Sequence, residues 1–120
     1  IAHALAWPAR LQTHVPEINL FMHHQLDFQA PDMVRFPALR LAREAMQTGG
    51  LAPAILNAAN EVAVAAFLAE HIRFLDIAEI VEHTLNHVQN GSAQELSFIL
   101  HADEQARQVA TARVIDIGKA

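Results

Sequence analysis

The fold is decided by the stretch Leu56–Leu68, which reads LNAANEVAVAAFL. It lies within an apolar segment, about Pro53–Ile72, in which alanine is the commonest residue. Alanine has the highest intrinsic helix propensity, and small side chains let neighbouring helices approach closely. The segment is therefore predicted to be the central and most buried helix of the chain. Ala59, Ala63 and Ala66 recur at helical spacing, so we expect them to face a neighbouring helix.

Helices are also predicted on both sides of this central segment. Pro37 suits the first turn of a helix, because that turn does not need the N–H that proline lacks. The pair Gly49-Gly50 ends this helix. Capping-box spacing, which marks a helix start, occurs at Asp76 with Glu79 and at Ser92 with Glu95. The flanking helices are predicted from Pro37 to Gly49, from Asp76 to Asn90, from Ser92 through Leu100 and from about Asp103 to Gly118.

The first third of the chain has a different character. A helix over residues 1–7 is expected to stop before Pro8, which disfavours helix at the preceding residue. Leu26–Phe28 alternates apolar and polar residues, which predicts a short edge strand that pairs with something else. The fold class is therefore mainly α, with a helical bundle at residues 37–120 and a connecting segment at residues 1–36 that holds one short strand. Because the first residue is Ile1 and not methionine, we expect a piece of a longer protein.

Composition argues against several classes of function. The 120 residues fit one domain, and 8 Lys+Arg against 13 Asp+Glu give a net charge of −5. No nucleic-acid partner is expected, because phosphate binding needs a basic surface. The absence of cysteine rules out disulfides and thiolate metal sites, and it fits a reducing cytoplasm. Polar residues interrupt the longest apolar stretch, so no membrane span is expected.

The best candidate for a metal site is the set Glu79, His83 and His87, which are spaced four residues apart on one predicted helix. Two histidines at that spacing can share a zinc ion. However, no HExxH motif accompanies them, and any solvated helix is expected to carry polar residues on one face. We favour the solvated face and predict no metal ligand.

A polar stripe on the central helix is the most informative local feature. Asn57, Asn60 and Glu61 lie three and four residues apart on an otherwise apolar segment. A buried amide without a partner costs about 1–3 kcal/mol. We therefore expect the stripe to bond neighbouring backbone and to tie the helix to residues 26–37. A polar binding site is the less favoured alternative, because no base or nucleophile accompanies the stripe. Neither a GxSxG nor a GxGxxG nor a Walker motif is present, so no reactive serine or nucleotide loop is predicted.

Three segments together resemble the 1-deoxy-D-xylulose 5-phosphate reductoisomerase family. They are IAHALAWP at residues 1–8, LDF with APD and RFP at residues 26–37, and LNAANEVAVAAFL at residues 56–68. The match continues through IRF and DI at residues 72–77 and covers nearly the whole chain. One departure is Asp27, which stands where the family often has threonine.

The resemblance implies an oxidoreductase and isomerase of the non-mevalonate isoprenoid pathway. Such an enzyme rearranges 1-deoxy-D-xylulose 5-phosphate and reduces it with NADPH to 2-C-methyl-D-erythritol 4-phosphate, aided by Mg or Mn. It also implies a cytoplasmic homodimer of bacterial type whose C-terminal helical bundle follows a Rossmann-type domain and a catalytic domain. The family's nucleotide loop, metal carboxylates and phosphate contacts lie before the segment that matches Ile1. We therefore expect no catalytic, cofactor-binding or metal-binding residue in this chain, whose partner is then the catalytic domain of its own polypeptide.

Two other functions stay open on the residues alone. One is a free-standing helical module that binds a protein partner through the polar stripe. The other is a small metal-binding helical protein that uses His83 and His87.

Overall fold

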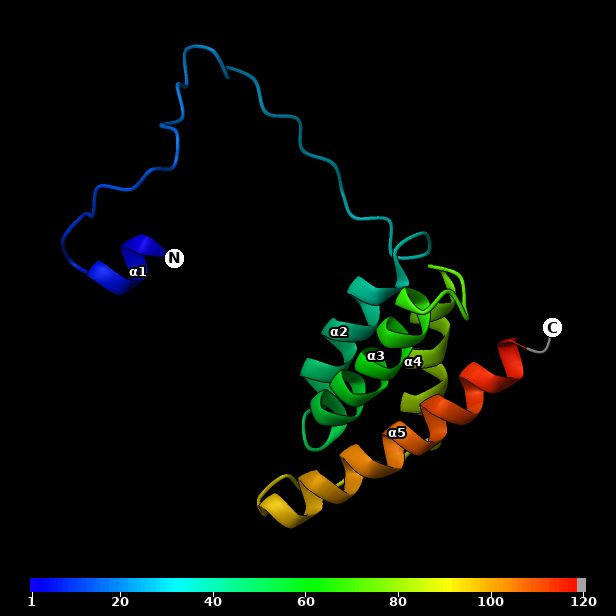
Figure 1. Ribbon diagram of the computed structural model, residues 1–120. Coiled ribbons are helices and arrows are strands. Elements are labelled where there is room, and N and C mark those ends of the chain that lie inside the picture. Colours follow the sequence, from blue (N-terminus) through cyan, green and yellow to red (C-terminus); the bar gives the residue numbers. More distant parts are fainter. Residues whose placement is uncertain (119–120) are drawn as a thin grey trace. The chain divides into compact units, whose positions relative to one another are not determined.

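A computed structural model describes residues 1–118 and contains helices as its only regular elements in that range (Figure 1). They are α1 (Ala2–Ala6), α2 (Pro37–Thr48), α3 (Ala52–Leu68), α4 (Asp76–His87) and α5 (Leu96–Gly118). The prediction of a mainly α protein is confirmed, although the last two residues of the predicted bundle range, 119–120, lie outside the described part. The chain divides into two units, Ile1–Ala30 and Pro31–Ala120. Within residues 1–118, no helix has the length and apolar character of a membrane span.

The first unit contains α1 and an irregular segment after it. The helix ends before Trp7 and Pro8, as the sequence predicts. Leu26–Phe28 has no strand conformation in the described residues, so the predicted short strand is not confirmed. A strand needs a paired neighbour for its backbone groups. The large apolar side chains of this first unit are exposed, among them Ile1, Leu5, Trp7, Phe21, Met22 and Phe28.

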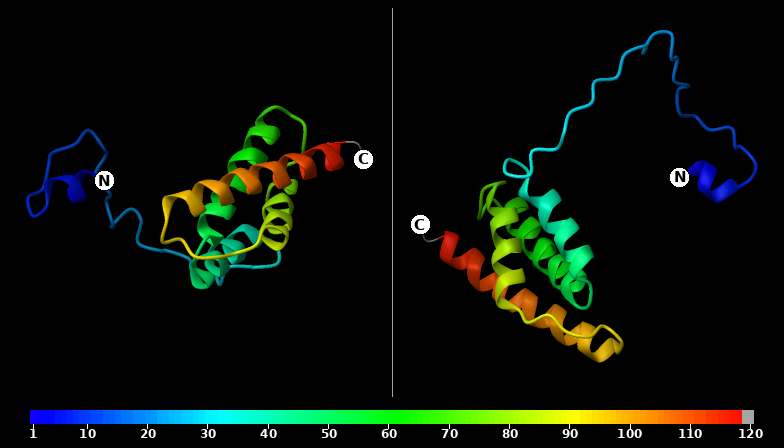
Figure 2. Two further views of the ribbon diagram at one scale, coloured as in Figure 1. Left: turned by 90° about the horizontal axis from the view of Figure 1, so that it is seen from below. Right: turned by 180° about the vertical axis from the view of Figure 1, so that it is seen from behind.

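The second unit is a helical bundle organised around α3, which contacts α2, α4 and α5. The left view of Figure 2 shows α5 lying across α3. Ala59 and Ala63 have no exposed surface and Ala66 is 9% exposed, so the predicted buried face is confirmed. Alanines are small enough to let the helix backbones come close together. The central position that the sequence assigns to α3 follows from this stripe.

Two apolar clusters form the core, one towards each end of α3. The first joins Ala59, Ala63 and Ala66 to Ile80 of α4 and Ala110 of α5. The second consists of Leu51, Ile55, Ala58, Val88, Ala102 and Ala106. Alanines of α5 therefore face alanines of α3 along both clusters.

The C-terminal region is one continuous helix, which corrects the prediction of two. The sequence predicted a short helix from Ser92 through Leu100 and a second one from Asp103, but α5 runs unbroken from Leu96 to Gly118. No glycine or proline separates Leu100 from Asp103. Buried alanines at four-residue spacing keep one face of α5 on the core across the supposed break; they are Ala102, Ala106 and Ala110.

The turn between α3 and α4 also differs from its prediction. The helix α3 ends at Leu68 and not at Ile72, because Glu70 has a φ of 60° in the left-handed region. The His71 N–H donates to the Ala66 carbonyl and the Glu70 N–H to the Phe67 carbonyl, both at 2.9 Å. These two bonds form a Schellman motif, which glycine usually closes. Because glutamate rarely takes this position, the sequence did not predict that the helix would end here.

The predicted capping box at the start of α4 is wrong in its bonding. The Asp76 carboxylate accepts the Arg73 backbone N–H at 2.8 Å and the Arg73 Nη2 at 3.1 Å. Glu79, the other expected member, binds Arg113 of α5 at 2.6 Å. The start of α4 is therefore held by the residues before it.

A set of hydrogen bonds joins the α2–α3 turn to the segment that follows α4. The Leu51 N–H donates to Asn90 Oδ1 at 2.8 Å and to the Gly91 carbonyl at 3.1 Å. In return, Asn90 Nδ2 donates to the Gly49 carbonyl at 3.3 Å. Gly49 and Gly50 both have positive φ, of 66° and 59°. The turn that the sequence assigned to these glycines is therefore also a contact between distant segments.

Two matched substitutions test this contact between the two loops. Gly49→Ala meets no atom within 4 Å, but the φ of 66° and ψ of −154° at this position form a backbone conformation that is essentially limited to glycine, so the change should cost about 1–3 kcal/mol of unfolding free energy. A Cβ on Gly50 would overlap the Gly91 carbonyl oxygen and lie 2.9 Å from Asn90 Oδ1. Gly50→Ala should therefore cost a further ~1–3 kcal/mol, as overpacked sites do. Urea denaturation of both variants measures the difference, and equal losses would show that the two loops do not touch.

Candidate functional site

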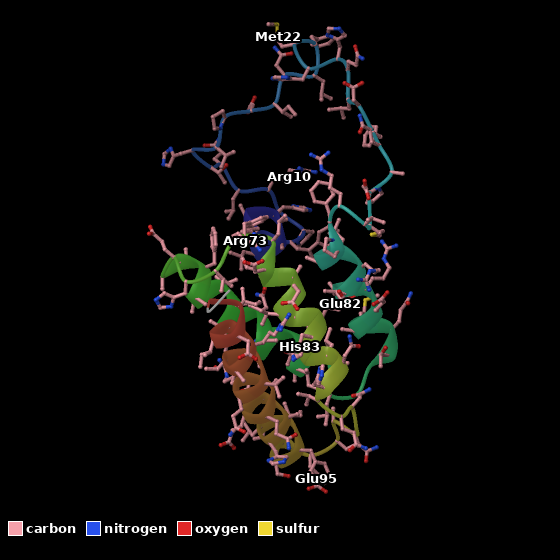
Figure 3. All side chains as sticks on the ribbon, turned by 90° about the vertical axis from the view of Figure 1, so that its right-hand side faces the viewer. Arg10, Met22, Arg73, Glu82, His83 and Glu95 are labelled. Atoms are coloured by element: carbon pink, nitrogen blue, oxygen red, sulfur yellow. The ribbon has the colours of Figure 1, made fainter. Side chains whose placement is uncertain are left out.

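Charged side chains of the bundle pair across the seams between helices. Arg40 of α2 donates to Glu82 of α4 at 2.6 Å, and Glu82 is labelled in Figure 3. Arg113 of α5 donates to Glu79 of α4, also at 2.6 Å. The pairs are partly exposed, where ion pairs add little stability. They link α2 to α4 and α4 to α5 at the edges of the apolar core.

The polar stripe of α3 belongs to this set of contacts. Asn57, Asn60 and Glu61 are exposed, so the expectation of a buried stripe is wrong. Asn57 Nδ2 donates to Glu61 Oε1 at 3.0 Å, and Arg107 of α5 donates to Glu61 Oε2 at 2.7 Å. The predicted attachment to residues 26–37 gains no support, because Asn57 is bonded within its own helix. The stripe instead joins α3 to α5.

This network keeps its charges fixed and does not tune them for proton transfer. Arg107, and after it the Asn57 amide, lowers the pKa of Glu61 below its usual value. Asp103, and after it Glu61, raises the pKa of Arg107. A general base works best with a pKa near the working pH. Glu61 has been moved in the opposite direction, which suits a permanent ion pair.

The sequence candidate for a metal site is held by other contacts. Glu79 is occupied by Arg113, while the rings of His83 and His87 stack with centroids 3.9 Å apart. His87 Nδ1 lies 2.7 Å from the His83 carbonyl oxygen. Burial of the ring, followed by the charge of His87, lowers the pKa of His83. No group of three possible ligands that could hold a metal ion occurs among residues 1–118.

A surface hollow of about 750 Å³ lies where the turn before α4 meets the end of α5. Its arginines are already bound: Arg73 pairs with Asp76 at 3.1 Å and Arg113 with Glu79. The Arg73 side chain, and then its backbone N–H, lowers the pKa of Asp76. Both arginines that line the hollow are therefore already paired with a carboxylate and are not available to bind a ligand.

The sequence did not predict the arginines that pair between helices, which are Arg40, Arg107 and Arg113. The i,i+4 spacing of Asp103 and Arg107 was a visible signal for one local pair. The carboxylates that Arg40, Arg107 and Arg113 bind on other helices lie 34 to 46 positions away along the chain, where no local pattern reveals them. The described polar groups thus form a structural set of ion pairs and bring together no nucleophile, base and anion-stabilising group.

Comparisons with known proteins agree on one family. The family model described as the DXP reductoisomerase C-terminal domain matches residues 1–109. The 1-deoxy-D-xylulose 5-phosphate reductoisomerase of Acinetobacter baumannii ATCC 17978 is 58% identical over 118 residues. That match covers 98% of this chain and 30% of the relative. The counterpart from Acinetobacter baylyi is 61% identical over 110 residues, which are 92% of this chain and 28% of the relative.

Solved structures give the same result. The reductoisomerase from Zymomonas mobilis in complex with NADPH is 48% identical with a TM-score of 0.81, over 94% of this chain and 30% of that one. A DOX-P reductoisomerase in complex with NADPH, fosmidomycin and magnesium is 41% identical with a TM-score of 0.84, over 95% of this chain and 30% of that one. The chain thus spans just under a third of the relatives that it matches. It belongs to the DXP reductoisomerase C-terminal domain family.

Proposed function

We propose that this chain is the C-terminal part of an enzyme that converts 1-deoxy-D-xylulose 5-phosphate to 2-C-methyl-D-erythritol 4-phosphate. The observation that carries the proposal is the family match over residues 1–109, together with 58% identity across 98% of the chain. In this proposal the whole enzyme uses NADPH and a divalent metal, Mg or Mn, and works as a homodimer in the cytoplasm. NADPH and magnesium are named as bound in the related structures.

Within that enzyme the chain has a bracing role and not a chemical one. Residues 37–120 form the bundle domain, and residues 1–36 form the connection to the catalytic domain. The short strand at Leu26–Phe28 forms when the preceding part of the polypeptide supplies a neighbouring strand. The exposure of Leu26 and Phe28, at 69% and 87%, supports this, because such side chains need a cover.

Among residues 1–118, no group of three possible ligands could hold a divalent metal, and the sequence has no dinucleotide-binding loop. Mg and Mn prefer carboxylate and water oxygens that are free to coordinate. Here the carboxylates Glu61, Glu79, Glu82 and Asp76 are bound to arginines. A dinucleotide phosphate needs a glycine-rich turn before a helix, and the motif is absent from the sequence. Both cofactors are therefore assigned to the part of the enzyme outside this chain.

The first test of this proposal is a calorimetric titration of the chain with NADPH. No heat of binding is expected at micromolar concentrations, since no part of the chain fits the cofactor. The full-length enzyme that carries the chain is the positive control under the same conditions. Micromolar binding by the chain alone would contradict the bracing role.

A second test separates stability from turnover in the full-length enzyme. Asn57→Leu would cost about 1–3 kcal/mol if the amide were buried against backbone. Because Asn57 is exposed, we expect a change within about 0.5 kcal/mol, and unchanged turnover. Urea denaturation and a steady-state NADPH assay measure the two quantities. Normal stability with turnover reduced about a hundredfold, some 2.7 kcal/mol of barrier, would place the polar stripe in an active site.

A further inference from the structure

The helix α2 has an apolar arc that is wider than the part covered by the bundle. Leu41 and Ala45 point into the core and are 3% and 5% exposed. Beside them, Leu39 and Met46 stay 53% and 71% exposed, and the exposed Ala42 lies between these two. These three positions share one face, because three- and four-residue steps bring helical side chains together.

The remaining side of α2 is polar, which makes the apolar arc distinctive. It carries Arg40, Arg43, Glu44 and Gln47. The rotation of the helix is set by the burial of Leu41 and Ala45 and by the Arg40 pair with Glu82 of α4 at 2.6 Å. The exposed apolar arc therefore faces away from the bundle, and rolling α2 to bury it would expose Leu41 and Ala45.

The arc continues into the residues that lead into α2. Phe36 is 53% exposed and Val34 is 93% exposed. We define the outer face of α2 as Val34, Phe36, Leu39, Ala42 and Met46. Contiguous apolar patches of this kind usually mark an interaction site, whereas single exposed apolar residues do not.

We propose that the outer face of α2 docks against the part of the same polypeptide that precedes this chain, in the region of the catalytic domain. This rests on the proposed function, since a free-standing bundle would have no such part. The chain spans 30% of its relatives, and its family model is a C-terminal domain, so most of the remaining length comes before it. The outer face begins where the connecting segment enters α2. An apolar helix face with anchors at i, i+3 and i+7 is suited to a groove.

Thiol labelling of the full-length enzyme tests this docking at two adjacent positions. Met46→Cys places a thiol on the outer face, and Gln47→Cys places one on the polar side of the same helix. The labelled peptides are identified by mass spectrometry, and both rates are normalised to those in urea. The thiol at position 46 should react at least about tenfold more slowly in the native enzyme, because a covered group reacts only after local opening.

The possible outcomes separate a cover within the same polypeptide from a second copy and from no cover. Equal labelling at both positions would overturn the docking. Protection that disappears on dilution would also overturn it, since the cover would then be a second copy. Turnover is measured on the unlabelled wild-type enzyme in parallel, and an absence of reductoisomerase activity there would reject the proposed function whatever the labelling shows. Oxidation of Met46 by peroxide in the wild-type enzyme, native against unfolded, gives the same readout if Met46→Cys does not fold.

Discussion

The close approach of helices along alanine-lined faces is the constraint on which the rest of the bundle depends. Ala58, Ala59 and Ala63 of α3 have no exposed surface, and neither have Ala106 and Ala110 of α5. Larger side chains at these positions would push the helices apart, because protein interiors have almost no free volume. With α5 and α4 packed directly on α3, Ile55 and Ile80 are the largest apolar side chains that are fully buried in the described core.

The ion pairs act on top of that packing, and they explain why the polar residues form no active site. Arg40, Arg107 and Arg113 each bind a carboxylate of another helix at 2.6 to 2.7 Å. Pairing lowers the pKa of Glu61, so the Arg107 contact is complete above the ordinary pKa of glutamate and is lost only as the pH falls below it. The sequence shows these charges but not their distant partners, so it cannot reveal that Glu61 on α3 is bound by Arg107 of α5 at the surface.

The order of helices could largely be predicted from the sequence, whereas several of their ends could not. Pro37 and the alanine-rich segment have local causes that act within a few residues, so α2 and α3 were correctly expected. The end of α3 depends on Glu70 in a conformation that normally requires glycine. The continuity of α5 depends on the burial of Ala102, Ala106 and Ala110 against the core, which overrides the predicted break before Asp103. The strand at Leu26–Phe28 requires a partner strand, which no local pattern can supply.

The measurement that most directly tests the central role of alanine packing is urea denaturation of Ala63→Leu against Ala65→Leu. Both variants add the same atoms to α3, but Ala63 is fully buried and Ala65 is exposed. Ala63→Leu should lower the free energy of unfolding by about 1–3 kcal/mol through overpacking, and Ala65→Leu should change it by less than about 0.5 kcal/mol. Equal stability of the two variants would contradict the account, because it would mean that α4 and α5 do not pack closely on this face of α3.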